Sequence, residues 1–156
     1  MLCFPNDYKK GKSDVASKDI SMNWITQRMN LDPFSFVFVA ETIPSKKIIG
    51  FAIYLMIGGL SGVVELELIG VDEKYRKRGI GSQIIIKSEP IVARLLQLRF
   101  SKPLYKLLLT TSIENPSSHS FYKKHGYILT GNLGKLYWNT EEAVYTKEYH
   151  KANLTR

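Results

Sequence analysis

The alternation of apolar and polar residues predicts three consecutive strands in the first half of the chain. Aromatic and β-branched residues dominate 34–42 and 48–57, and the first half of 63–72 alternates between apolar and acidic residues. Only short polar or glycine-containing segments separate these runs. Strands joined by short turns pair in an antiparallel meander, which is the arrangement we expect here.

A helical periodicity replaces this alternation after Gly79. Apolar residues recur at spacings of three, four or seven up to about Arg99, which predicts an amphipathic helix. Pro90 lies inside this helix and should kink or split it, because proline has no backbone N–H. An earlier helix is expected over about 19–30, after a polar, lysine-rich and irregular arm over 1–19.

The second half of the chain alternates between strands and a helix. The apolar run 104–112 predicts a buried strand, and 115–126 predicts a short helix with a capping residue and a terminal glycine. Two last strands are expected near 127–131 and 142–149. This order indicates an α+β fold. Because no repeat or linker interrupts it, we expect one domain over 1–156.

Composition narrows the class of partner. Lysine and arginine number 22 against 14 acidic residues, and the resulting formal charge of +8 favours anionic partners. The most apolar stretch, 48–60, is too short for a membrane helix, so we expect no membrane partner. With Cys3 as the single cysteine and no signal peptide, we expect a reducing, cytoplasmic setting.

Residues 75–82, "YRKRGIGS", combine three cations with two glycines between a strand and the start of a helix. Backbone N–H groups at a helix N-terminus have no partners within the helix, and the helix dipole is positive there. The glycines would let a bulky anion approach the backbone. The spacing matches neither a dinucleotide fingerprint nor a P-loop. On its own, the octet is either a diphosphate site or a solvated basic turn.

Two motifs together carry a resemblance to a family. The first is Arg76-x-x-Gly79-x-Gly81 after "ELIGVDEKY", and the second is "ENPSSHSFYKKHGY" at 114–127. In this order, the chain resembles the GNAT superfamily of acetyl-CoA-dependent N-acetyltransferases. The resemblance implies a mixed, mostly antiparallel central sheet flanked by helices. Only about 34 residues precede the first strong strand, so the N-terminal unit of that fold should be shortened.

The resemblance also implies which residues bind the donor, acetyl-CoA. The turn and helix start would hold its diphosphate, through residues Arg76, Lys77, Arg78, Gly79, Ile80, Gly81 and Ser82. The strand residues Ile69, Gly70 and Val71 would pair with the pantetheine arm, and an amide there could stabilise the oxyanion of a tetrahedral intermediate. Asn115 would bind the pantetheine amides. Without the resemblance, Gly70 indicates an ordinary bulge and Asn115 a helix cap.

Catalysis in such a fold implies an acid and a base. Tyr122 would protonate the departing thiolate, although alone it indicates a half-buried helix tyrosine. Alternation predicts that Glu65 and Glu67 lie on the same face of their strand as Ile69 and Val71. We expect Glu67 to be the base, through a water. The alternative is a solvated pair of carboxylates.

Three functions therefore remain open. The first is an acyltransferase that moves acetyl from acetyl-CoA to a primary amine by direct attack, with a small-molecule or protein acceptor. The second is a non-catalytic acyl-CoA sensor. The third is a basic nucleic-acid-binding domain, which is less favoured because few aromatic residues are interleaved with the basic cluster. A homodimer is compatible with each. We expect no metal, since His119, His125 and His150 lack ligand spacing.

Overall fold

The computed structural model describes residues 26–27, 30, 33–137 and 140–149, and of residues 136 and 137 it describes the backbone alone. The arm expected over 1–19 lies outside these residues, as does most of the helix expected over 19–30, of which Thr26 and Gln27 are helical. The shortened N-terminal unit likewise falls outside the described residues.

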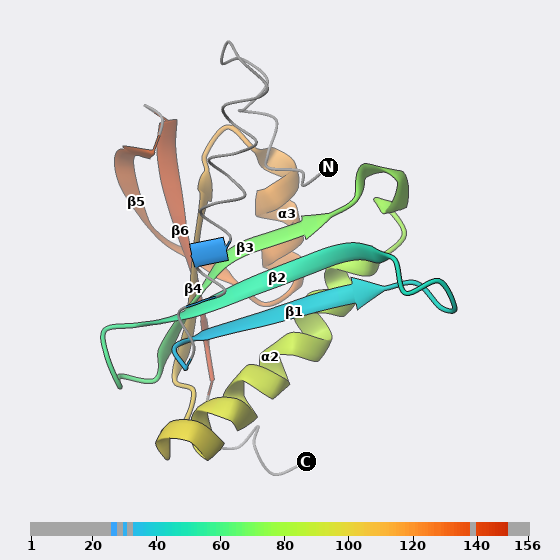
Figure 1. Ribbon diagram of the computed structural model, residues 1–156. Coiled ribbons are helices and arrows are strands. Elements are labelled where there is room, and N and C mark those ends of the chain that lie inside the picture. Colours follow the sequence, from blue (N-terminus) through green and yellow to red (C-terminus); the bar gives the residue numbers. More distant parts are fainter. Residues whose placement is uncertain (1–25, 28–29, 31–32, 138–139, 150–156) are drawn as a thin grey trace.

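A six-stranded sheet in the order β1-β2-β3-β4-β6-β5 forms the centre of the molecule (Figure 1). Its strands are β1 (Ser35–Glu41), β2 (Ile48–Ile57), β3 (Val63–Val71), β4 (Lys106–Ser112), β5 (Ile128–Tyr137) and β6 (Thr140–Glu148). Only β3 and β4 pair in parallel, and all other neighbours are antiparallel. The mixed, mostly antiparallel sheet and the N-terminal meander are confirmed.

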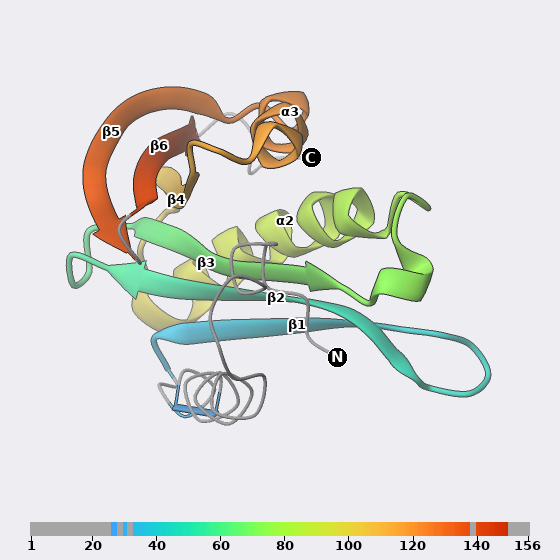
Figure 2. The ribbon, with the colours of Figure 1, turned by 90° about the horizontal axis from the view of Figure 1, so that it is seen from above.

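Two helices lie on the same side of this sheet (Figure 2). They are α2 (Ile80–Phe100) and α3 (Pro116–Lys124), and a short 3-10 turn, η2 (Glu73–Tyr75), precedes α2. The buried side of α2, which includes Ile85, Val92 and Leu96, joins the core residues of β2 and β3. No helix in the described part of the chain is long and apolar enough to cross a membrane.

The expected split of α2 and the length expected for β5 are wrong. The helix α2 is not split at Pro90 but continues from Ile80 to Phe100. Because Pro90 has no N–H, the carbonyl of Ile86 has no helical hydrogen-bond donor. Both residues lie on the solvent side of α2, where water can donate to that carbonyl. The strand β5 extends to Tyr137 rather than ending near 131. The residues after Leu129 are mostly exposed and carry no apolar alternation, so the sequence pattern does not indicate this part of the strand.

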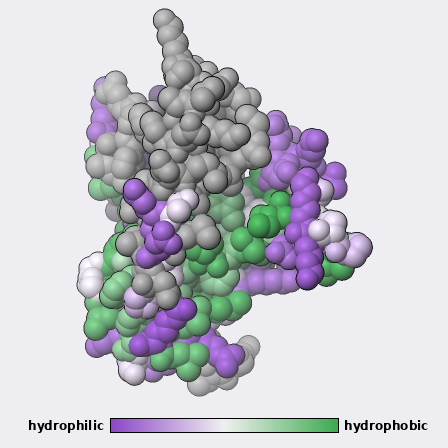
Figure 3. Space-filling model, viewed as in Figure 1, coloured by the Kyte–Doolittle hydropathy of each residue, from purple (hydrophilic) through white to green (hydrophobic). Residues whose placement is uncertain are grey.

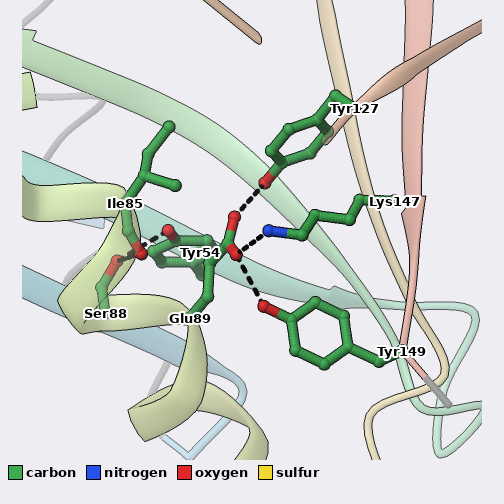
Figure 4. A network of polar contacts seen from close by, with 7 residues as sticks. All are labelled: Tyr54, Ile85, Ser88, Glu89, Tyr127, Lys147 and Tyr149. Carbon is green, nitrogen blue, oxygen red and sulfur yellow. Dashed lines mark hydrogen bonds and ion pairs between the residues drawn. The ribbon is translucent and has the colours of Figure 1, made fainter. Parts of the chain in front are cut away.

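A buried carboxylate connects α2 to the C-terminal strands (Figure 4). Glu89 is 2% exposed, and its Oε2 accepts hydrogen bonds of 2.6 Å from both Lys147 Nζ and the Tyr149 hydroxyl. Its Oε1 accepts from the Tyr127 hydroxyl at 2.8 Å. The charge of Glu89 is thus paired and hydrogen-bonded, as a buried charge requires. The network fixes α2 against β6.

Candidate functional site

The parallel strands β3 and β4 diverge soon after they begin. Residues Val63–Glu65 pair with Lys106–Leu108, and no later residue of β3 pairs with β4 (Figure 1). Since the carboxyl ends of parallel strands lie at the same edge of a sheet, β3 and β4 deliver the starts of α2 and α3 to one edge. We call residues 66–71 of β3, which have left β4, the open edge.

The open edge presents backbone groups of two particular residues. Asp72 N–H donates to Ile49 O across 2.8 Å, so Asp72 directs its backbone groups towards β2. Backbone groups of successive residues in a strand alternate between the two neighbouring sides. Ile69 and Val71 therefore direct their groups away from β2, towards the gap left by β4, whereas Gly70 directs its groups towards β2.

Gly70 has a packing reason to be glycine. A Cβ added there would overlap the side-chain ring of Phe51, the residue of β2 that pairs with Gly70. This contact differs from the bulge that the sequence allowed as the alternative explanation. The absent side chain at Gly70 thus makes room for Phe51.

A β-bulge occurs in β3 at Glu67. Ile53 pairs with Leu68 and the next residue, Tyr54, pairs with Leu66, which leaves Glu67 as the extra residue. An extra residue reverses the alternation of faces beyond it. The Oε2 atom of Glu67 is buried.

The bulge corrects the expected position of Glu65. Paired residues share a face, and Ala52, which packs with α2 in the core, pairs with Ile69. Leu55, on the opposite face of β2, pairs with Glu65. The prediction that Glu65 shares a face with Ile69 and Val71 is therefore wrong.

The connection from β3 to α2 is hydrophilic and exposed (Figure 3). Arg76 returns to the strand, since its Nε donates to Val71 O at 3.2 Å. Lys77 and Gly79 both have positive φ, 58° and 77°, and together they turn the chain into α2. Arg78 lies over the ring of Tyr75, with 5.5 Å between its Cζ and the ring centroid. The side chains of Arg76 and Arg78 therefore make different contacts.

The N-terminus of α2 leaves its first amides open. Gly79 is the N-cap, it supplies no side-chain hydrogen bond, and the space where its Cβ would lie is empty within 4 Å. The first helical bond runs from Gln83 N to Gly79 O at 3.0 Å, so the N–H groups of Ile80, Gly81 and Ser82 lack helical partners. Bare backbone and free N–H groups are what a diphosphate needs, and this turn fits one.

Asn115 caps α3 at the same edge of the sheet. Its Oδ1 accepts hydrogen bonds from Ser118 N–H at 3.3 Å and from the Ser117 hydroxyl at 2.7 Å. Its Nδ2 makes no hydrogen bond within the described part of the chain. The side chain is thus a cap that still has donors to offer a ligand.

Tyr122 lies in the last turn of α3, packed among aromatic rings. The ring centroids of Phe121, Tyr127 and Tyr145 lie 5.4, 5.9 and 6.2 Å from its own. Burial raises the pKa of Tyr122 to about 12. The phenol therefore keeps its proton at neutral pH and can act only as a donor of it.

No pattern in the sequence indicates two contacts that fix α3. His119 Nε2 donates to Ile113 O at 3.0 Å, and its Nδ1 lies 2.8 Å from the Tyr145 hydroxyl. His125 Nε2 lies 3.0 Å from Ser82 Oγ, which links the end of α3 to the start of α2. No periodicity or motif marks such pairs, because their partners are distant in sequence. Within the described ranges, no cluster of three potential ligands could hold a metal ion.

Comparisons with known proteins agree on one family. The model of the "Acetyltransferase (GNAT) family" matches residues 3–127, most of the chain. A search of curated proteins gives no match.

Solved structures share the fold at low sequence identity. An acetyltransferase of the GNAT family from Desulfovibrio desulfuricans is 17% identical with a TM-score of 0.66, covering 85% of this chain and 81% of that one. A variant of the spermidine N-acetyltransferase SpeG from Vibrio cholerae is 19% identical with a TM-score of 0.66, covering 83% and 74%.

A third structure contains the donor. It is a GNAT family acetyltransferase from Elizabethkingia anophelis with acetyl-CoA bound, 21% identical with a TM-score of 0.65, covering 84% of this chain and 85% of that one. The family model, the sheet that opens between β3 and β4, and the free amides of α2 lead to the same conclusion. This chain belongs to the GNAT family of acetyltransferases.

Proposed function

We propose that the chain moves an acetyl group from acetyl-CoA, bound along the open edge, directly to a primary amine. The diphosphate accepts hydrogen bonds from the N–H groups of residues 80–82, and Arg76, Lys77 and Arg78 supply positive potential around it. Gly79 keeps this approach free of a side chain. The pantetheine arm pairs with the backbone of Ile69 and Val71.

In the transfer itself, an N–C bond forms and the C–S bond of the thioester breaks. The amine loses one proton, and the thiolate gains one from the Tyr122 hydroxyl. A pKa of about 12 favours this role, because the phenol is protonated whenever the thiolate departs. Asn115 Nδ2 is free to bind an amide carbonyl of the pantetheine arm.

Glu67 takes up the amine proton through a water. The bulge takes Glu67 out of the regular alternation of β3, within the open edge. Glu65 lies on the face opposite Ile69 and Val71 and is the weaker candidate.

The observation that carries this proposal is the convergence of two helix starts on an edge where β3 has lost its neighbour. The acceptor is an amine of a small molecule or of a protein. The single cysteine, Cys3, favours the cytoplasm as the site of action, and the reaction requires neither a membrane nor a nucleic acid. We propose one domain over 1–156, and we retain a homodimer as a prediction.

The test is thiol release from acetyl-CoA over a panel of amines and peptides, with CoA affinity measured by calorimetry. Gly79→Glu should weaken CoA binding at least tenfold, because it adds a negative side chain where the diphosphate binds. Gly59→Glu is the matched control, since Gly59 also has positive φ and open space around its Cβ. Unchanged CoA affinity in Gly79→Glu would refute the diphosphate site. Tight CoA binding without turnover on any acceptor would favour the sensor.

A further inference from the structure

The last turn of α3 contacts the first turn of α2 at the end that carries the free amides. His125 Nε2 lies 3.0 Å from Ser82 Oγ, and Ser82 is the third residue of α2. The His125 backbone N–H donates to Tyr122 O at 2.9 Å. One turn of α3 thus contains both the proposed acid and a side chain that touches the anion-binding turn.

Phe121 holds the His125 ring in this position. Their ring centroids are 4.8 Å apart in an edge-to-face arrangement. The Phe121 ring also packs against Gly81, whose Cβ, if present, would lie 3.4 Å from it. The imidazole is therefore fixed between the Phe121 ring and the Ser82 hydroxyl.

The imidazole of His125 is neutral at neutral pH. Burial, the largest influence, lowers its pKa, and the charges of Lys124 and Lys147 act in the same direction, while the Glu89 carboxylate opposes them. A neutral imidazole has one N–H, and Ser82 has one O–H. A single hydrogen bond joins them, so one of the two is its donor and the other its acceptor.

We propose that His125 is a positioning residue for the diphosphate of the donor: its Nε2–H donates to Ser82 Oγ, which leaves the Ser82 hydroxyl proton to donate to a phosphate oxygen. This inference rests on the proposed binding of acetyl-CoA at the turn. A diphosphate oxygen only accepts hydrogen bonds, so it selects this arrangement. In the reverse arrangement, Ser82 would present only lone pairs to the anion.

The test compares CoA binding with turnover of a donor that lacks the diphosphate. His125→Leu and Ser82→Ala should each weaken CoA binding about tenfold, which is typical of losing a hydrogen bond to a charged group. The double variant should be no weaker than either single one. His125→Gln should retain most of the affinity, because its amide can still donate. Turnover of acetyl-pantetheine, which has no diphosphate, should fall much less than CoA affinity in His125→Leu and Ser82→Ala, and the control Ser120→Ala on the exposed side of α3 should change neither.

Two results would overturn the inference. Equal losses with acetyl-CoA and acetyl-pantetheine would show that His125 only supports α3 and Tyr122. Wild-type CoA affinity in His125→Leu and Ser82→Ala would show that the pair does not bind the diphosphate. If Gly79→Glu still weakens CoA binding, only the role of His125 fails; if it does not, the proposed site itself fails. Nitrogen NMR shifts of His125 provide a readout independent of activity, and protonation at Nδ1 in the CoA complex would also refute the proposal.

Discussion

Arg76 donates from Nε to the carbonyl oxygen of Val71 across 3.2 Å, so the first cation of the turn is anchored to the last residue of β3. The same carbonyl lies at the open edge, where the pantetheine arm is proposed to pair. Arg76 therefore connects the diphosphate end of the donor site to its pantetheine end.

We predict that Arg76→Lys weakens CoA binding several-fold although it keeps the charge. Lysine has no Nε–H in the planar arrangement that reaches the Val71 carbonyl, so the turn loses its anchor. Calorimetry with CoA measures the effect, and Lys102→Arg, an exposed exchange in the loop after α2, serves as the control. Wild-type affinity in Arg76→Lys would mean that charge alone matters at this position.

Tyr122→Phe should lower kcat by about 100-fold or more while leaving the KM for acetyl-CoA nearly unchanged, as expected when an acid is lost. Because the pKa of Tyr122 is about 12, its titration should not limit the rate below about pH 11. Steady-state rates from pH 6 to 10.5 test both points. Tyr105→Phe, at a tyrosine that is 50% exposed, is the control. A rise in KM with unchanged kcat would contradict the assignment of Tyr122 as the acid.

Glu67→Gln should reduce kcat/KM about 100-fold, whereas Glu65→Gln should change it only a few-fold. The difference follows from the bulge, which puts Glu65 on the face away from Ile69 and Val71. If both variants keep wild-type rates, neither carboxylate is the base.

Glu89→Ala should lower the free energy of unfolding by about 3 to 5 kcal/mol, because it leaves Lys147 without its buried partner. Urea denaturation followed by circular dichroism measures it. Lys106→Gln, which removes an ion pair with Glu148 whose side chains are 41% and 59% exposed, should cost about 1 kcal/mol or less. Similar losses in the two variants would contradict the importance assigned to burial.

The sequence predicts the elements that carry a periodic signal. The strands β1 to β4 and the helix α2 lie where alternation and helical spacing placed them, and Asn115 caps α3 as its residue type indicates. Motif order then identified the family. These features are local, so a single stretch of chain contains the information for each.

The features that the sequence could not predict depend on neighbours across the sheet. The Glu-Leu-Glu-Leu alternation continues through the bulge, and only the pairing with Ile53 and Tyr54 shows that Glu67 is extra. The contact between Ser82 and His125 joins residues from two helices, so no spacing along the chain encodes it. The extension of β5 beyond residue 131 has no sequence signal, because its exposed residues need no apolar pattern.

The central claim is that the donor lies along the open edge and against the start of α2. Residue-resolved amide exchange with and without CoA tests it most directly. We predict slower exchange on CoA binding at Val71 and at Ile80, Gly81 and Ser82, with no change at Gly59 in the opposite turn. Protection confined to other residues, with these four amides unaffected at saturating CoA, would contradict the account.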